Sequence, residues 1–369
     1  LHAVIHENGT QQSLENYTIP EIKVWQLNEM SDEKVVFQRE KIRERLTEKQ
    51  YQPGTWPLFD VEISYVKNNI IIHFSLDMLV ADFSSINIIM EELEKYYYNE
   101  KMPQKKKLSY RDIVKYNVNS IKLPDHAEKR KKDEKYWKDR ISNMPEGPSL
   151  PLNVKEELVS VYQLNTYIEK QQMIRLSEFA KSNNLTLSTV ILSMYIEVLR
   201  YWSEKKDFCI NITMSDRADI HSEINKVIGD FTVVDILETR NTPEQDFIER
   251  TKNVQKQLWE DLAHLSYTGV EVLREMAKVK KKDVIIPYVY TSTIGLQENS
   301  DEDFGNKTNG KLIYKISQTP QVLIDCQAME YNGGILVNWD IRKNIFPENL
   351  VESAFEAFEK LLNFKDIES

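Results

Sequence analysis

Residues 317–339 read SQTPQVLIDCQAMEYNGGILVNW and carry the clearest fold signal in the chain. The dipeptide Asn332-Gly333 separates two largely apolar runs, and these two residue types accept the positive φ angles of a tight hairpin turn. The sequence therefore predicts a β-hairpin with strands over residues 321–329 and 335–339.

The two faces of the first predicted strand differ in chemistry. One face is apolar and consists of Val322, Ile324, Cys326 and Ala328. The other carries a carboxylate and two amides beside one leucine, in the order Gln321, Leu323, Asp325 and Gln327. Residues 284–292 predict another strand, which ends in the hydroxyls of Thr291 and Ser292. A polar face opposite an apolar one suits a polar cavity, but spacing alone leaves open whether Asp325 meets Thr291.

Strands and helices alternate outward from this hairpin. Strands are predicted over residues 59–65, 70–76 and 208–214. Helices are predicted over residues 126–142, 174–182 and 188–202, and from starts at Asp82 or Ser84, at Thr242 and at Pro347. Pro and Gly cluster in residues 143–151 and favour a boundary between an N-terminal lobe, 1–150, and a C-terminal lobe, 151–369. The class is α/β or α+β with two lobes.

The composition excludes several functional classes. The chain of 369 residues has 58 Asp and Glu and 48 Lys and Arg, which gives a net charge of −10. A nucleic-acid-binding protein would be basic, so that class is not expected. The basic run at residues 129–132 is interpreted as a solvated helix face. Glycine is scarce, at 10 residues, and no phosphate-binding glycine loop occurs. No membrane-spanning run is present, and a cytoplasmic location is expected.

Cysteine and histidine usage gives no metal site. Cys209 and Cys326 lie in apolar stretches and are expected to be buried free thiols. The six histidines have no ligand spacing among themselves or with the cysteines. A serine nucleophile elbow of the form G-x-S-x-G is also absent.

A second constellation is residues 77–85, DMLVADFSS, which have the form D-x-x-x-x-D-x-x-S. Asp77 ends a predicted strand, and Asp82 stands where it can cap a helix. If these residues have only a structural role, Asp82 caps that helix and Asp77 pairs with an arginine.

A third constellation is residues 228–232, IGDFT, with Arg217 shortly before it. Apolar neighbours make Asp230 a partly buried carboxylate, which must be paired or protonated. An arginine partner is the expected explanation.

Together these stretches resemble the heterocyclization (Cy) domain of nonribosomal peptide synthetases, within the condensation-domain superfamily. That family carries D-x-x-x-x-D-x-x-S, met here as Asp77, Asp82 and Ser85. It also carries V-G-D-F-T, P-V-V-F-T-S and S-Q-T-P-Q-V-x-L-D, which are met here at residues 228–232, 287–292 and 317–325. Ile228 replaces Val, Tyr288 and Tyr290 are substitutions, and Ile324 replaces Leu.

The resemblance implies a V-shaped pseudo-dimer of two chloramphenicol-acetyltransferase-like lobes with a central tunnel. Upstream and downstream carrier proteins, with an adjacent adenylation domain, would deliver substrates on phosphopantetheine arms, and the domain itself would bind no cofactor. The reaction would join an acyl group to Cys, Ser or Thr and then cyclise and dehydrate the product to a thiazoline or oxazoline.

The resemblance also assigns roles to individual residues. It implies that Thr291 and Asp325 catalyse cyclodehydration, and that Gln321, Ser292 and Gln318 position the substrate. Asp77, Asp82, Ser85, Arg217 and Asp230 are expected to be architectural residues at the site, with Arg217 as the partner of Asp77 or Asp82. Met78 stands where ordinary condensation domains have their functional histidine, and its side chain cannot transfer a proton.

One departure from the family concerns the start of the chain. Residues 1–4, LHAV, resemble an L-R-A-V motif that in the family follows an additional strand and helix. That first strand and helix of the N-terminal lobe are therefore expected to be missing. Two alternatives stay open: an amide synthase that closes no ring, and a non-catalytic platform that recruits partner proteins.

Overall fold

The computed structural model describes residues 1–99, 107–153, 160–217, 220–295 and 310–363. Its contacts divide the chain into two compact units. The first comprises Leu1–Val114 and Arg217–Phe231, and the second comprises Lys115–Asp216 and Thr232–Ser369. Helix α3 (Tyr110–Ser120) crosses from the first unit into the second. The mixed α/β class is as the sequence predicts.

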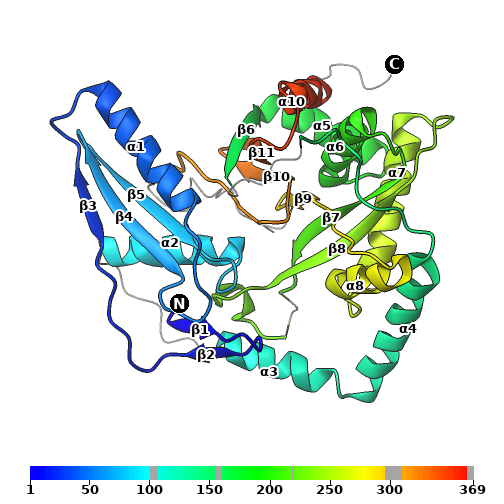
Figure 1. The fold of residues 1–369 in the computed structure, drawn as a ribbon, viewed down its shortest axis with the longest axis horizontal. Helices are drawn as coiled ribbons and strands as arrows, with labels where there is room; N and C mark the ends of the chain where they lie inside the picture. The colour runs from blue at the N-terminus through cyan, green and yellow to red at the C-terminus, as the bar shows by residue number, and fades with distance from the viewer. Residues whose placement is uncertain (100–106, 154–159, 218–219, 296–309, 364–369) are drawn as a thin grey trace. The chain divides into compact units, whose positions relative to one another are not determined.

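The first unit is built on the three-stranded sheet β3-β4-β5 (Figure 1). Its strands are β3 (Lys23–Gln26), β4 (Phe59–Val66) and β5 (Asn69–Leu76). The central strand β4 pairs parallel with β3 and antiparallel with β5. Helices α1 (Asp32–Thr47) and α2 (Phe83–Tyr97), a small sheet of β1 (Ala3–Ile5) and β2 (Gln11–Ser13), and the short helix η1 (Ile224–Lys226) complete the unit.

The second unit is built on a six-stranded mixed sheet in the order β6-β11-β10-β9-β7-β8. Its strands are β6 (Val161–Ile168), β7 (Phe208–Ser215), β8 (Thr232–Thr239), β9 (Tyr288–Ser292), β10 (Ile324–Tyr331) and β11 (Gly334–Arg342). Strand β9 runs parallel to both neighbours, β10 and β7, while the other pairs are antiparallel.

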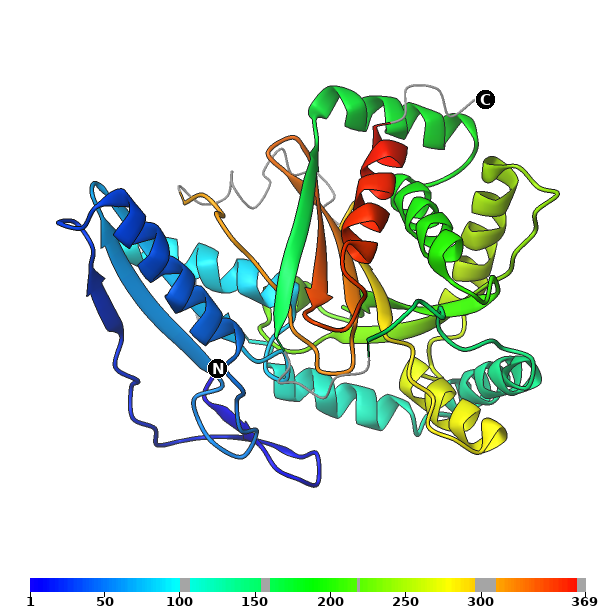
Figure 2. The same cartoon turned by 45° about the horizontal axis from the view of Figure 1, so that its top comes forward.

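Helices cover one face of this sheet along its length (Figure 2). They are α5 (Lys170–Ser182), α6 (Leu187–Trp202), α7 (Phe247–Leu262) and α10 (Leu350–Leu362). The main core forms here because α6 is apolar around most of its circumference and packs between the sheet and the other helices. Helices α4 (Pro124–Ile141) and α8 (Gly269–Lys280) form a second core with Cys209 and Ile236 of β7 and β8.

The predicted hairpin is confirmed as β10 and β11. Asn332 and Gly333 have φ angles of 49° and 74° at its turn, in the left-handed region that a two-residue hairpin needs. The predicted start at Gln321 is too early, because the backbone makes a turn with Val322 N bonded to Thr319 O at 3.0 Å before β10 begins at Ile324.

The helix expected to start at Thr242 starts later. Its N-cap is Asp246, whose side chain accepts a hydrogen bond from Glu249 N at 2.8 Å, whereas Thr242 lies in the preceding turn. The capping box occurs instead at α8, between Thr268 and Glu271.

The compact units differ from the lobes expected at 1–150 and 151–369. The Pro- and Gly-rich segment 143–151 lies inside the second unit, and α4, assigned to the first lobe, packs against α8. The segment from Arg217 to Phe231 joins the first unit, where it supplies partners for Asp82. In the described part of the chain, no helix is both long and apolar enough to span a membrane.

Candidate active site

A row of polar side chains crosses the six-stranded sheet on the face opposite α6 and α10. Asp340 of β11 lies between Gln163 of β6 and Asp325 of β10 in the strand register, and Gln327 lies beside Thr291 of β9. Successive side chains on a strand point to opposite faces of the sheet. The apolar residues between these polar ones therefore point to the helix-covered core. The register therefore brings together groups from four strands.

Thr291 and Asp325, predicted to act together, are within reach of each other. The Thr291 hydroxyl donates to Asp325 Oδ1 at 3.3 Å. On the other side, Gln327 Nε2 donates to Asp325 Oδ2 at 2.7 Å and to Asp340 Oδ2 at 3.1 Å. One amide group thus bridges two carboxyl groups.

Lys315 brings a positive charge to this cluster from the segment before β10. Its Nζ donates to Gln327 Oε1 at 2.9 Å. Gln163 Nε2 donates both to Asp340 Oδ1, at 2.6 Å, and to the Lys315 carbonyl, at 2.7 Å. Ser317 N donates to Asp340 Oδ2 at 2.7 Å. We refer to Gln163, Thr291, Lys315, Asp325, Gln327 and Asp340 as the carboxylate network.

Burial changes the proton affinity of the charged members. It raises the pKa of Asp325, an effect opposed by Gln327, Lys315 and Thr291. Burial, together with the charge of Asp325, raises the pKa of Asp340 to about 7. Burial also lowers the pKa of Lys315 to about 8, against the attraction of the two carboxylates. Groups that exchange protons near neutral pH are suited to acid–base catalysis.

Sequence reasoning missed three members of the carboxylate network: Gln163, Lys315 and the role of Asp340. Asp340 could have been found, because a two-residue turn at 332–333 places it opposite Asp325. Gln163 and Lys315 gave no such signal, since their positions depend on a distant strand and on an irregular segment.

The predicted substrate-positioning residues lie on segments that flank the carboxylate network, since Ser292 follows Thr291 and Gln318 follows Ser317. Gln321 is exposed in the turn before β10, and Gln318 is half-buried in the same segment. Ser292 is half-buried at the end of β9, and its hydroxyl accepts from Ile294 N at 3.3 Å. Their roles toward substrate stay predictions.

The second constellation, residues 77–85, forms a buried polar cluster inside the first unit. Asp82 caps α2, accepting from Ser85 N at 2.8 Å and from the Ser85 hydroxyl at 2.6 Å. The same Asp82 oxygen accepts from Arg217 Nη2 at 2.7 Å. The Ser85 hydroxyl also contacts the backbone of Gly229, donating to its carbonyl at 3.0 Å and accepting from its N–H at 3.1 Å. These contacts tie the start of α2 to Arg217 and Gly229, and the architectural role of Asp82 and Ser85 stays a prediction.

Asp77 has a contact that differs from the arginine pairing expected for it, whereas the partner of the Asp230 carboxylate stays a prediction. Asp77 accepts from Leu79 N at 2.9 Å, so it stabilises the turn after β5. Arg217, expected to pair with Asp77 or Asp82, pairs with Asp82. Asp230 is half-buried, and its carbonyl accepts from the Tyr110 hydroxyl at 2.7 Å.

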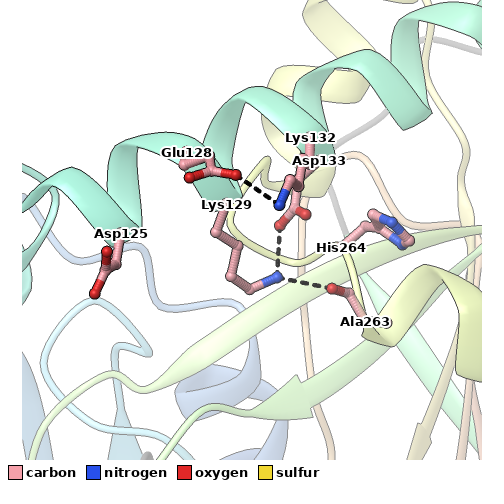
Figure 3. Close-up of a pocket in the computed structure, with 7 residues that line it drawn as sticks. All are labelled: Asp125, Glu128, Lys129, Lys132, Asp133, Ala263 and His264. Atoms are coloured by element: carbon pink, nitrogen blue, oxygen red, sulfur yellow. Dashed lines mark hydrogen bonds and ion pairs between the residues drawn. The ribbon is translucent and has the colours of Figure 1, made fainter.

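A surface hollow beside α4, with a volume of about 430 Å³, is lined by charged side chains (Figure 3). Lys129 donates to Asp133 and to the Ala263 carbonyl, and Lys132 pairs with Glu128. Within the basic run, Lys129 and Lys132 therefore pair with carboxylates of their own helix, whereas Arg130 pairs with Glu271 of α8.

Comparison with known proteins connects this geometry to a family. A model of the condensation domain matches residues 2–364. The chain belongs to the condensation-domain family. Bacitracin synthase 1 of Bacillus licheniformis is 31% identical to this condensation domain over 368 residues. Pyochelin synthetase PchF of Pseudomonas aeruginosa is 29% identical over 366 residues. The alignments cover 97% and 98% of this chain but only 7% and 20% of those relatives.

Solved structures agree with the sequence relatives. The cyclization-docking bidomain of the synthetase EpoB from Sorangium cellulosum superposes on this condensation domain with a TM-score of 0.85 at 27% identity, covering 98% of this chain and 73% of that one. The resemblance to heterocyclization domains of nonribosomal peptide synthetases is thereby confirmed.

Proposed function

We propose that this domain forms an amide between an acyl group and a Cys, Ser or Thr, and then closes a thiazoline or oxazoline ring with loss of water. The observation that carries this proposal is the contact between Thr291 and Asp325 within the carboxylate network, at 3.3 Å. Family membership and the likeness to a cyclization domain support it.

Amide formation needs little side-chain chemistry in this proposal. Met78, at the position of the functional histidine of ordinary condensation domains, is exposed and cannot accept a proton. Holding an activated acyl thioester and an amine together removes much of the entropic barrier by itself. The amine attacks the thioester carbon, the thiolate leaves and the amine loses a proton.

Ring closure needs an acid and a base. The side-chain thiol or hydroxyl loses its proton as it adds to the amide carbonyl carbon, and the carbonyl oxygen gains one proton. That oxygen gains a second proton and leaves as water, and the nitrogen loses its proton as the C=N bond forms. We assign the proton transfers to Asp325, whose pKa is raised by burial. Thr291 is assigned to orient Asp325 or to donate a hydrogen bond to the departing oxygen.

The partners in this proposal are two carrier proteins and a neighbouring adenylation domain. The substrates arrive on phosphopantetheine arms, so the domain holds no resident cofactor. Solved relatives that are multidomain synthetases support this setting. The V-shaped arrangement of two lobes around a tunnel stays a prediction from the resemblance.

The test is reconstitution of the full chain with an acyl-loaded upstream carrier and a downstream carrier loaded in separate assays with Cys, Ser or Thr. Intact mass separates the outcomes, because ring closure loses one further water. We expect Asp325→Asn to retain linear amide formation and to lose ring closure by about a hundredfold or more. Ring closure by Asp325→Asn at the wild-type rate would contradict the catalytic assignment. A wild-type product that stays linear would support the amide synthase, and no product would support a recruiting platform.

A further inference from the structure

We propose that Lys315 and Asp340 are positioning residues for Asp325: the Lys315 ammonium group balances one carboxylate charge, and one proton is shared between Asp325 and Asp340. This inference rests on the proposed function, since it assigns the control of the proton that ring closure uses.

The first observation is geometric. Two carboxyl groups accept from the same Gln327 nitrogen, so they lie close enough to repel each other when both are ionised. The oxygen of that same amide accepts from Lys315 Nζ at 2.9 Å. Gln327 therefore orients both carboxyl groups toward one side of its amide and the cation toward the other.

The second observation is that hydrogen bonds to Asp340 hold the segment around Lys315 in place. Gln163 donates to the Lys315 carbonyl and to Asp340, so the irregular segment around Lys315 is tied to β11. Ser317 N, two residues later, donates to Asp340. Asp340 itself is buried, with 3% of its surface exposed. A displaced Lys315 would leave an uncompensated charge in this buried site, which is costly.

The charge count follows from the groups around Asp325. Asp340 faces it from β11 and Lys315 from the preceding segment, while Thr291 of β9 and Gln163 of β6 carry no charge. Behind the sheet, burial raises the pKa of Cys326 and of Tyr195 on α6, so both are neutral. Among the residues that the structure describes, one cation therefore faces two carboxyl groups, and one proton held between them balances the charge.

The inference predicts opposite effects for the two residues. Removing the cation with Lys315→Met disfavours ionised Asp325, so the carboxyl-dependent limb of the pH–rate profile for ring closure should move to higher pH by about one unit. Removing the like charge with Asp340→Asn should move the same limb to lower pH by about the same amount. The sign of each shift holds whether Asp325 acts as acid or as base.

The experiment measures ring closure alone, with the N-acetylcysteamine thioesters of benzoyl-cysteine and benzoyl-serine as probes. The variants are Lys315→Met, Asp340→Asn and the double variant, with Lys311→Met as the matched control because Lys311 is exposed in the same segment. The control should keep the wild-type profile. The double variant should return toward wild type, because it removes one charge of each sign. Circular dichroism checks that each variant is folded.

Unchanged pH profiles in folded Lys315→Met and Asp340→Asn would overturn the inference. If Lys315→Met does not fold, the double variant is compared with Asp340→Asn. Identical pH profiles in these two variants would also overturn the inference. The proposed function fails separately, when Asp325→Asn closes the ring at the wild-type rate. Loss of ring closure in Asp325→Asn together with unshifted profiles would refute only the roles of Lys315 and Asp340.

Discussion

Asp325 and Asp340 occupy opposite positions on β10 and β11, and both accept a hydrogen bond from the single Nε2 of Gln327, at 2.7 and 3.1 Å. Two acidic groups in register on one sheet face would repel each other when ionised. Their pairing here depends on the amide between them, on Lys315 and on a retained proton. Holding the two carboxyl groups together in a buried site lowers the stability of the fold when both are ionised.

That cost should appear as a pH-dependent stability difference between the wild type and Asp340→Asn. The pKa of Asp340 is raised from its usual value to about 7, so between about pH 4 and pH 7 the folded state holds a proton that the unfolded state releases. Rising pH therefore favours unfolding of the wild type in this window. Lys315, with its pKa lowered to about 8, stays protonated throughout.

We expect the free energy of unfolding of the wild type to fall relative to Asp340→Asn by about 1 to 4 kcal/mol across that window, at about 1.4 kcal/mol per unit of pKa shift. Urea denaturation at several pH values measures it. Parallel curves for the two proteins would show that Asp340 titrates alike in both states.

Arg217→Met should destabilise the domain strongly. It removes the ion pair with Asp82 at 2.7 Å and two bonds that Arg217 Nη1 donates to the carbonyls of Ile224 and Val227, at 3.0 and 2.9 Å. Asp82 would stay buried without its arginine partner, which corresponds to a loss of about 3 to 5 kcal/mol. Thermal unfolding should show this loss, while Lys226→Met, an exposed change in the same segment, should behave like the wild type.

Gly229→Ala tests the close packing around the I-G-D-F-T segment. A Cβ atom at this position would lie 2.1 Å from Tyr110 Cδ2, far inside van der Waals contact. We expect a loss of about 1 to 3 kcal/mol of stability from this overpacking. The clash is specific, so adding Tyr110→Ala to Gly229→Ala should cost less than the two separate changes combined. Additive losses in this double-mutant cycle, measured by urea denaturation, would place the strain elsewhere.

Cys209 and Cys326 should resist thiol reagents in the folded protein. Both are buried free thiols, and burial raises the pKa of each, so thiolate is scarce as well as inaccessible. We expect both to react quickly with a maleimide in denaturant and at least a hundredfold more slowly in buffer, followed by intact mass. Fast labelling of either thiol under native conditions would mean that the core opens locally.

The sequence by itself determined the local elements and the residue types of the site. Alternation predicted β4, β5 and the β10–β11 hairpin because a strand with one buried face repeats every two residues. It also gave Asp82 as the N-cap of α2, a contact made within four residues. Thr291 and Asp325 were recognised as candidates through their motifs, without knowledge of their distance.

Only the tertiary structure decided what surrounds those residues. Parallel pairing of β10 with β9 placed Thr291 beside Gln327, and pairing of β11 with β6 brought Gln163 to Asp340. Arg217 reached Asp82 across 135 positions of sequence. Local periodicity fixes which face a residue occupies, but the choice of neighbouring strand depends on the packing of the whole sheet against its helices. The charge environment of Asp325, set by Lys315 and Asp340, is therefore a property of the fold.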